Sequence, residues 1–345
     1  MPEKVTSEWL TGVLRRGGSL GSGSVVNVDV VLAKELPFST ITRLAVGYSA
    51  DASTSAPTRL FLKTPLTGVT SEHIEREVEF YRDVASEMPE SPFIRCFGAV
   101  CEPEQGDSFV LLEDLSDTHF QPESPEPPSP IYCELAVECL ARLHANWWND
   151  PRLGKSVGRV FSKSELDSFL ADVEANVVRF IDFLGDELTE EQRRAYDLLL
   201  VSKRKIWGRL TDPAGLTVTH GDAHWWNFLY PLDTVKDRVR LFDWQLWHID
   251  VGARDLAFLV ALGGFASEKT VADEILVRRY HEKLVTEGVE NYTWDNCWDD
   301  YRWSAIRNLN IPVIFWSQGR KREFWQENLE RAIKSFDEME CAELL

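Results

Sequence analysis

The sequence predicts an α+β fold in two parts: a β-rich part to about residue 115 and a larger, mainly helical part over 116–345. Three observations support this prediction. Apolar and β-branched runs separated by turn residues fill the segment 25–64. From residue 131 onward, apolar residues recur at the three- and four-residue spacing of amphipathic helices. Between the β-rich and the helical regions, the segment 121–130 contains five prolines and cannot form regular structure.

Length and composition are those of an ordinary globular protein. The chain has 345 residues, 44% hydrophobic and 27% charged, which is enough for two domains or one two-lobed fold. No apolar run approaches the ~20 residues of a membrane span. The N-terminus also lacks the apolar core of a secretory signal. We therefore expect a cytoplasmic protein with no membrane partner, and its six scattered cysteines, with no C-x-x-C pair, predict reduced thiols rather than a zinc site.

The net charge of −19 constrains the partners. The chain has 37 basic and 56 acidic residues. Nucleic-acid binding depends on a basic surface, so this balance argues against a nucleic-acid partner. It is compatible with a cationic small molecule, although many enzymes are simply acidic. The oligomeric state does not follow from these patterns.

The N-terminal part should begin with a helix over Ser7–Arg16, capped by Thr6 or Ser7. A glycine- and serine-rich segment, Gly17–Ser24, follows. It lies before a strand rather than between a strand and a helix, which favours a linker over a phosphate-binding loop. Predicted strands then cover Val25–Leu32, Ile41–Tyr48, Arg59–Lys63 and Phe109–Leu112, and a predicted helix covers His73–Ala85.

The segment 220–243 carries the clearest chemical signal. It reads HGDAHWWN from His220 to Asn227 and continues through an apolar run to Asp243. We expect the short apolar segments on either side, Leu216–Thr219 and Val239–Phe242, to be strands of a hairpin-like unit with Asp222, Asn227 and Asp243 at one end. Phosphoryl transfer uses this set of groups: one carboxylate for the hydroxyl proton, and an Asn and a second carboxylate for Mg²⁺.

A metal-dependent phosphoesterase is an alternative for the same segment. His220, Asp222, His224 and Asp243 are residue types that bind metals, and D-x-H after a strand opens a dinuclear phosphoesterase signature. The further blocks of that signature are absent from the sequence. A zinc site would also need a third histidine nearby, and the only later ones are His248 and His281.

The pattern His220-Gly221-Asp222-x-His224-x-x-Asn227, followed by Asp243-Trp244-Gln245, resembles a known family. It is similar to the catalytic loop and metal-binding motif of aminoglycoside phosphotransferase-like and choline-kinase-like small-molecule kinases. The ecdysteroid-kinase-like (CHK kinase-like) branch is the closest in style. The resemblance extends over roughly 25–259. It implies a two-lobed, protein-kinase-like fold with a small β-rich N-lobe and a larger, mainly helical C-lobe.

In this resemblance each motif residue has an implied role. Asp222 corresponds to the catalytic base, and Asn227 and Asp243 to the Mg²⁺ ligands. His220 would brace the loop. Asp255 would stabilise it from a distance, or would instead be an ordinary carboxylate in the first turn of a helix.

The N-terminal part carries the implied nucleotide-binding residues. Lys63 ends an apolar strand, and its implied partner is Glu77, with the neighbouring Glu75 and Glu79 as alternatives in register. Without the downstream motif, Lys63 would be read as a surface lysine. The connection Ala33–Thr40 occupies the place of the nucleotide-covering loop but has no glycine, which leaves Ser39 and Thr40 as possible phosphate contacts. Backbone groups around Glu113 and Leu115 correspond to the adenine-binding hinge.

The C-terminal part should contain helices over Ile131–Trp148, Ser164–Phe183 and Thr189–Leu210, with further helices from Thr270 to the end. His144 lies in the first of these and is interpreted as a packed structural histidine. For the acceptor pocket, the sequence offers one set of aromatic and acidic residues: Trp226, Trp294, Trp298 and Asp299. Packing for Trp226 and an amphipathic helix with a solvated acidic face for the other three are the alternatives.

The sequence thus predicts an ATP- and Mg²⁺-dependent O-phosphotransferase acting on a small-molecule hydroxyl, such as an aminoglycoside, amino alcohol or sterol. The acceptor would suit a cationic or ring-bearing compound. A catalytically idle binding protein with the same fold is the rival. Protein-kinase activity is disfavoured because no activation segment or APE-like block follows Asp243-Trp244-Gln245.

Overall fold

The computed structural model describes residues 5–37, 39–66, 72–88, 92–102, 107–122, 127–212, 214–263 and 269–345. The chain divides into two compact units. Unit 1 consists of Met1–Gln121 and Leu229–Trp247, and unit 2 of Pro122–Phe228 and His248–Leu345. Unit 1 therefore includes a later segment besides the N-terminal part that we expected to end near residue 115. Within the described residues, no helix is both long and apolar enough to span a bilayer.

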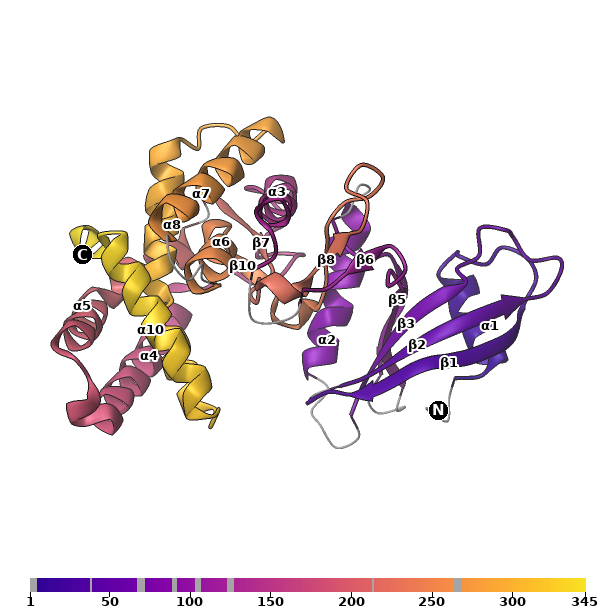
Figure 1. The fold of residues 1–345 in the computed structure, drawn as a ribbon, viewed down its shortest axis with the longest axis horizontal. Helices are drawn as coiled ribbons and strands as arrows, with labels where there is room; N and C mark the ends of the chain where they lie inside the picture. Colours follow the sequence, from indigo (N-terminus) through magenta and orange to yellow (C-terminus); the bar gives the residue numbers. More distant parts are fainter. Residues whose placement is uncertain are drawn as a thin grey trace. The chain divides into compact units, whose positions relative to one another are not determined.

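Unit 1 is built on a five-stranded antiparallel sheet with strand order β1-β2-β3-β5-β4, of which Figure 1 labels β1, β2, β3 and β5. The strands are β1 (Val25–Glu35), β2 (Ser39–Tyr48), β3 (Arg59–Pro65), β4 (Cys96–Glu102) and β5 (Asp107–Glu113). β1 and β2 are longer than expected, because their pairing continues to Glu35 and Thr40. Most of the connection predicted at 33–40 is therefore strand, with a tight turn in which the Leu36 N–H donates to the Ser39 carbonyl.

Helices cover both faces of this sheet. Helix α1 (Ser7–Arg16) begins at Thr6, whose hydroxyl accepts the N–H of Trp9. Side chains on one face of the sheet, such as Leu62 and Leu111, form a core with α1. Because side chains alternate along a strand, Lys63 lies on the opposite face. That face is covered by α2 (Glu72–Glu79) and its continuation, Phe80–Glu87.

A second, three-stranded sheet has the order β6-β8-β9, formed by His119–Phe120, Phe228–Pro231 and Arg240–Leu241. The hairpin-like unit predicted from sequence is wrong. β7 (Leu216–Thr219) does not pair with β9 but with β10 (His248–Val251), in register from His248↔Thr219 to Val251↔Leu216. The cause is burial: all four residues of β7 are buried, and Leu216 packs in a core with Ile249 and Val251.

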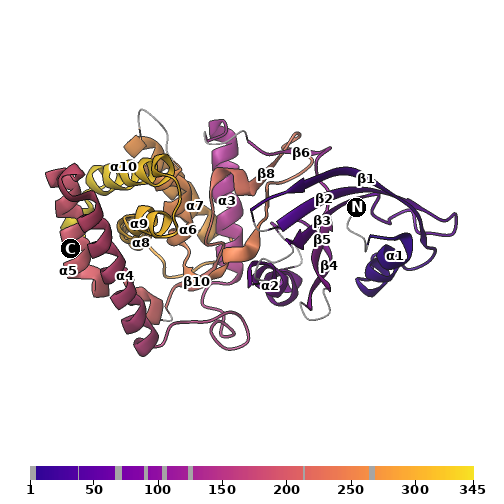
Figure 2. The ribbon, with the colours of Figure 1, turned by 90° about the horizontal axis from the view of Figure 1, so that it is seen from below.

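Unit 2 is mainly helical (Figure 2). Its helices are α3 (Pro130–Asn146), α4 (Lys163–Leu184), α5 (Glu190–Trp207), α6 (Ala253–Ala257), α7 (Lys269–Thr286), α8 (Trp294–Arg307), α9 (Asn310–Ser317) and α10 (Arg322–Glu338). Capping boxes at Ser162, Thr189 and Thr293 begin α4, α5 and α8. With a β-sheet N-terminal region and a helical C-terminal region, the predicted α+β fold class is confirmed.

Candidate functional site

In unit 1, Lys63 lies between two carboxylates. Its ammonium nitrogen is 2.6 Å from Glu77 Oε2 and 2.5 Å from Asp243 Oδ1. Lys63 comes from β3, Glu77 from α2 and Asp243 from the segment that follows β9. Lys63 and Glu77 are nearly buried, with 12% and 1% of their side chains exposed, whereas Asp243 is 28% exposed. Of the three glutamates considered, it is therefore Glu77 that reaches Lys63.

Burial and charge determine the protonation of this cluster. Burial lowers the pKa of Lys63, but the carboxylates of Glu77 and Asp243 outweigh burial and hold that pKa above its ordinary value. Burial raises the pKa of Glu77, and the Lys63 ammonium opposes that increase. Lys63 therefore keeps its positive charge beside one partly exposed carboxylate, that of Asp243.

The backbone at Asp243 is strained. Its φ of 69° and ψ of 62° lie in the left-handed region, which residues other than glycine seldom adopt. Next to it, the Trp244 ring stacks on Phe80 with centroids 3.7 Å apart and planes 3° apart. Trp244 is fully buried, so this stack is part of the core and anchors the residue that follows Asp243.

Helix α2 is joined to the same turn by a second pair of residues. Arg76 donates to the Trp247 carbonyl at 2.5 Å, and the Trp247 indole N–H donates to the Arg76 carbonyl at 2.8 Å. The Arg76 guanidinium also lies 4.9 Å from the Trp247 ring centroid. Neither residue belongs to a motif that the sequence predicts. The pair connects the helix that carries Glu77 to the turn that carries Asp243.

In unit 2, the motif loop follows β7 and is held by Asp255 from α6. The backbone N–H of His220 donates to Asp255 Oδ2 at 2.6 Å, and the N–H of Gly221 donates to Oδ1 at 2.9 Å. Gly221 has a φ of 81°, which only glycine adopts easily. Both oxygens of one buried carboxylate thus fix the start of the loop.

Hydrogen bonds within the loop position Asp222 and Asn227. The N–H of Asp222 donates to His220 Nδ1 at 3.2 Å. The side-chain N–H of Asn227 donates to the Asp222 carbonyl at 2.9 Å and lies 3.5 Å from Asp222 Oδ2. Asn227 is 4% exposed, so its side chain has one orientation, in which the amide nitrogen is used and the oxygen is available as a ligand.

His224 is a further neighbour of Asp222. Its Nε2 lies 3.5 Å from Asp222 Oδ2, and its ring lies 4.0 Å from the Trp226 ring, centroid to centroid. Burial raises the pKa of Asp222, but His224, with smaller contributions from His220 and Asn227, outweighs burial and holds that pKa below its usual value. Asp222 is therefore ionised at neutral pH.

Asp255 belongs to a buried network that the sequence revealed only in part. His144 Nε2 lies 3.3 Å from Asp255 Oδ2, and His144 Nδ1 is 2.7 Å from the hydroxyl of Tyr280. All three side chains are buried, which agrees with the structural role expected of His144. A Cβ added at Gly252 would come within 2.3 Å of the Tyr280 hydroxyl, so glycine is required there.

The other nucleotide-binding candidates lie on unit 1. Ser39 and Thr40 begin β2, and Ser39 is buried. At the end of β5, the Glu113 N–H donates to the Arg95 carbonyl, and the Leu115 carbonyl accepts the N–H groups of Thr118 and His119. These hydrogen bonds fix the shape of the expected hinge, and they already use the Glu113 N–H.

The proposed acceptor residues of α8 do not form one cluster. Trp294 and Trp298 stack on each other with centroids 5.6 Å apart, and the Arg278 guanidinium lies 4.0 Å from the Trp294 centroid. Asp299, in contrast, lines a cavity in which neither tryptophan takes part. The sequence grouped these residues because they are adjacent in the chain, but successive residues of a helix point about 100° apart.

A divalent metal would be held by oxygen atoms rather than by a compact histidine or cysteine cluster. The described part of the chain contains no group of three or more His, Cys, Asp or Glu side chains arranged to hold a metal ion. Asn227 in unit 2 and the partly exposed Asp243 in unit 1 each carry a hard oxygen of the kind that Mg²⁺ prefers.

Solved structures with the same fold are small-molecule kinases. A choline/ethanolamine kinase family protein from Mesorhizobium loti is 16% identical, with 90% of this chain and 88% of that chain covered and a TM-score of 0.53. The GDP complex of aminoglycoside 2'-phosphotransferase-IIIa is 13% identical, with 91% and 93% covered and a TM-score of 0.59. The amicoumacin kinase hAmiN, in complex with AMP-PNP, Ca²⁺ and Ami, is 13% identical, with 94% and 92% covered and a TM-score of 0.53. At these identities the likeness shows a protein-kinase-like fold.

Sequence comparison gives the family. Among curated proteins none matches this chain significantly. The model of the ecdysteroid kinase-like family, however, matches residues 37–290, which include Lys63, Glu77, the motif loop, Asp243 and Asp255. The resemblance stated from the motif residues is therefore confirmed, and the chain belongs to the ecdysteroid kinase-like family.

Proposed function

We propose that this protein transfers the γ-phosphoryl group of ATP to the hydroxyl of a small molecule in a Mg²⁺-dependent reaction. One observation carries the proposal: a chain of this family contains both a lysine fixed by two carboxylates and an ionised Asp222 on a loop braced by Asp255. The first arrangement suits nucleotide phosphates, and the second suits an acceptor hydroxyl.

Lys63 serves as the phosphate-holding cation. Glu77 fixes its ammonium group from the buried side, and Asp243 contacts it from the more exposed side. Two carboxylates face one ammonium, so the cluster keeps an excess negative charge that a divalent ion would balance. Mg²⁺, when bound, neutralises charge on the phosphate oxygens and keeps them oriented. Asp243 and Asn227 supply the protein oxygens for it.

Asp222 orients the acceptor hydroxyl and accepts its proton. The hydroxyl oxygen forms a bond to the γ-phosphorus while the bond from that phosphorus to the bridging oxygen breaks, and ADP leaves. The low pKa of Asp222 keeps the carboxylate ionised before the reaction. A weak base is sufficient because the proton leaves late in a loose phosphoryl-transfer transition state, so most of the rate gain comes from positioning and charge.

The test is a screen for γ-phosphate transfer from isotopically labelled ATP across a library of alcohols. The library should contain aminoglycosides, amino alcohols, sterols and sugars, each with and without Mg²⁺. We expect a phosphorylated product from at least one class, formed only with the metal. Label released only as inorganic phosphate, with no phosphorylated alcohol, would contradict the proposal.

Two variants make the screen specific. Asp222→Asn should lower product formation by about 10²–10⁴-fold and keep nucleotide binding. Asp233→Asn changes an exposed carboxylate in the loop after β8 and should behave like the parent protein. If neither the parent protein nor the control variant forms a product while both bind ATP and Mg²⁺, the chain is a binding protein with a kinase fold.

A further inference from the structure

Unit 2 contains a second candidate binding site in a cavity of about 660 Å³. The turn after α3 supplies Trp148 to its wall, the segment before β7 supplies Arg209, and the α7–α8 connection supplies Tyr292. Helix α8 contributes Asn296, Asp299, Asp300 and Trp303, which recur at the spacing of a single helix face. The volume is in the range of small-molecule pockets.

The cavity lies at the far end of β7 from the motif loop. Gly215, which lines the cavity, precedes β7, and His220, which begins the loop, follows it. A strand of this length separates its two ends by roughly 13 Å. Asp222 lies beyond the second end. A ligand in the cavity is therefore too far from Asp222 to accept a phosphoryl group, so the cavity is not the acceptor pocket.

An ion pair with one buried partner, Asp300, forms part of the cavity wall. Arg209 donates to Asp300 Oδ1 at 2.8 Å, and the Tyr292 hydroxyl donates to Asp300 Oδ2 at 3.1 Å. The Asp300 side chain is 6% exposed. A second bond from Arg209 to the Ala214 carbonyl, at 3.0 Å, fixes the guanidinium. The charges of Arg209 and Asp300 therefore cancel, and the wall is rigid.

The remaining charges make the cavity attractive to a cation. Apart from the Arg209–Asp300 pair, the lining includes three carboxylates, Asp212, Glu290 and Asp299, and one ammonium, that of Lys205. Asp299 also lies 3.9 Å from the guanidinium of Arg302, which does not line the cavity, so the excess is about one negative charge. Asp212 is partly used, because it accepts the N–H of Ala214 at 3.0 Å. Lys205 is also engaged, since it donates to the Leu344 carbonyl at 2.6 Å. An excess of negative charge at an open cavity raises the local concentration of cations.

Aromatic rings supply the rest of the wall. Trp148 and Tyr292 lie with ring centroids 4.7 Å apart at an angle of 57°. The Lys205 ammonium lies 5.3 Å from the Trp303 centroid, so this ring already accepts a cation within the protein. Carboxylates beside ring faces are the groups that recognise organic ammonium ions, through charge and cation–π contact.

We propose that this cavity is a second ligand site that binds a small organic cation bearing a ring or alkyl groups. The site is separate from phosphoryl transfer and does not depend on it.

The test is calorimetric titration of the full chain, without nucleotide, with benzyltrimethylammonium. Benzenesulfonate, a ring of similar size with the opposite charge, serves as the matched probe. We expect the cation to bind at one site per chain and the anion not to bind. Raising the salt concentration should weaken cation binding, because the carboxylates at the rim are exposed to solvent. Equal binding of both probes would overturn the proposal, as would no binding of the cation.

Variants locate the bound probe. The double change Glu290→Gln with Asp299→Asn should lower the affinity about tenfold, because two nearby charges are lost. Trp303→Leu should lower it roughly two- to fivefold. Asp295→Asn, an exposed change on the same helix that does not line the cavity, should leave it unchanged. A loss with Asp295→Asn equal to that of the double variant would show that only general surface charge is involved, and would overturn the proposal.

Two further variants separate this proposal from the kinase proposal. Asp222→Asn and Trp226→Leu change the motif loop and should leave cation affinity unchanged. If either weakens binding while the cavity variants do not, the cation binds near the loop and the second site does not exist. Since no nucleotide is present, a chain without kinase activity still passes or fails this test.

Discussion

The two polar centres of the molecule hold their buried carboxylates in different ways. In unit 1, Glu77 is balanced by a side chain, the ammonium of Lys63, which also contacts Asp243. In unit 2, Asp255 is balanced by two backbone N–H groups of the motif loop and by His144. Both carboxylates are about 1% exposed. The difference lies in what each carboxylate holds: one holds a flexible side chain and the other holds the backbone.

This difference suggests that the two centres have different roles. An ammonium between two carboxylates can turn toward a phosphate without any change in the backbone. Backbone N–H groups cannot move unless the loop moves, so Asp255 fixes where Asp222 and Asn227 lie. The lysine centre is therefore suited to exchange partners when a nucleotide binds, and the loop centre is preorganised. Changes at each centre should affect different measured quantities.

The largest effect is expected for Asp222→Asn in the motif loop. It should reduce turnover by about 10²–10⁴-fold, the usual contribution of a positioned base. The Asn227 contact to the Asp222 backbone carbonyl does not need the carboxylate, so the loop should keep its shape. Steady-state kinetics and a thermal melt measure the two effects. A variant with near-parent turnover would remove Asp222 from the reaction.

The second effect tests how strongly Asp255 holds the backbone of the motif loop. Asp255→Ala leaves the N–H groups of His220 and Gly221 without their buried acceptor, and each lost acceptor costs about 1–3 kcal/mol. We expect the free energy of unfolding to fall by roughly 3–5 kcal/mol, measured by urea denaturation. Asp255→Asn retains one acceptor oxygen and should lose less. Equal stability of Asp255→Ala and the parent protein would show that the loop does not depend on this carboxylate.

The sequence predicted much of this arrangement because the motif residues are close together along the chain. His220 to Asn227 lie within one loop, and hydrophobic periodicity placed most helices within a few residues of their observed ends. The pairing of β7 could not be found in this way. Sequence proximity favoured the run near Val239, whereas buried packing with Ile249 selects β10.

Contacts between distant segments were the other part that sequence patterns did not reveal. Arg76 and Trp247 form reciprocal hydrogen bonds although they lie far apart in the chain, and neither belongs to a motif. The separation of Trp298 from Asp299 was available in principle, since a helical wheel of 294–303 places them on different faces. Composition alone grouped them because it ignores direction.

The third effect tests the lysine centre of unit 1. Asp243→Ala should weaken binding of the Mg²⁺–nucleotide complex far more than binding of metal-free nucleotide, because the carboxylate acts through the ion. Its effect on the free energy of unfolding should be small, since the Lys63–Glu77 pair remains. Calorimetric titration with and without Mg²⁺ measures the first quantity. Equal losses in both titrations would show that Asp243 serves only to hold Lys63.

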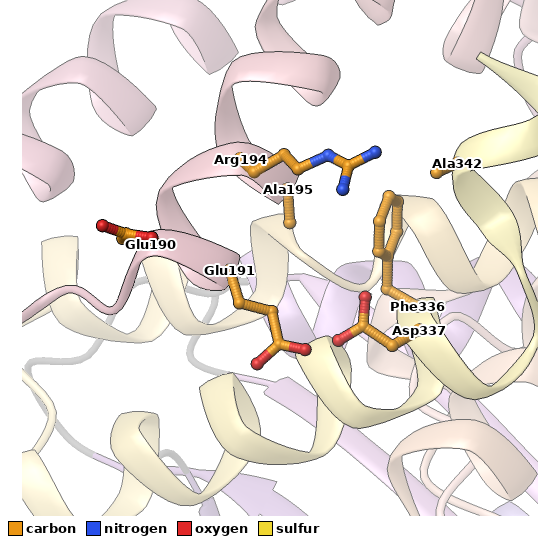
Figure 3. A pocket seen from close by; sticks show the side chains of 7 residues that line it. All are labelled: Glu190, Glu191, Arg194, Ala195, Phe336, Asp337 and Ala342. Atoms are coloured by element: carbon orange, nitrogen blue, oxygen red, sulfur yellow. The ribbon is translucent and has the colours of Figure 1, made fainter.

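The smallest effect concerns a second pair of neighbouring carboxylates. Unlike Glu77 and Asp243, this pair has no lysine between its members. Glu191 on α5 and Asp337 on α10 face each other across a small cavity, with Arg194 nearby (Figure 3). Burial, followed by the hydrogen bond and charge of Glu191, raises the pKa of Asp337 to about 6, although Arg194 opposes the shift and Glu338 adds to it. The folded state therefore binds a proton that the unfolded state has already released between about pH 4 and 6, so this pair loses stability as the pH rises through that window.

Glu191→Gln removes the like charge and should raise the melting temperature above about pH 6, where Asp337 of the parent protein is ionised. The gain should shrink as the pH falls through 6, because Asp337 is then protonated and the repulsion is gone. Glu190→Gln is the matched control, since the Glu190 side chain points away from Asp337 (Figure 3). Melting curves of both variants from pH 4 to 8 make the comparison. If Glu191→Gln gives the same gain at every pH, or if Glu190→Gln reproduces it, general surface charge rather than the facing pair is responsible. A rise in melting temperature that occurs only at high pH and only with Glu191→Gln would show that two facing carboxylates without a cation between them destabilise the folded state. At Glu77 the ammonium of Lys63 supplies that cation.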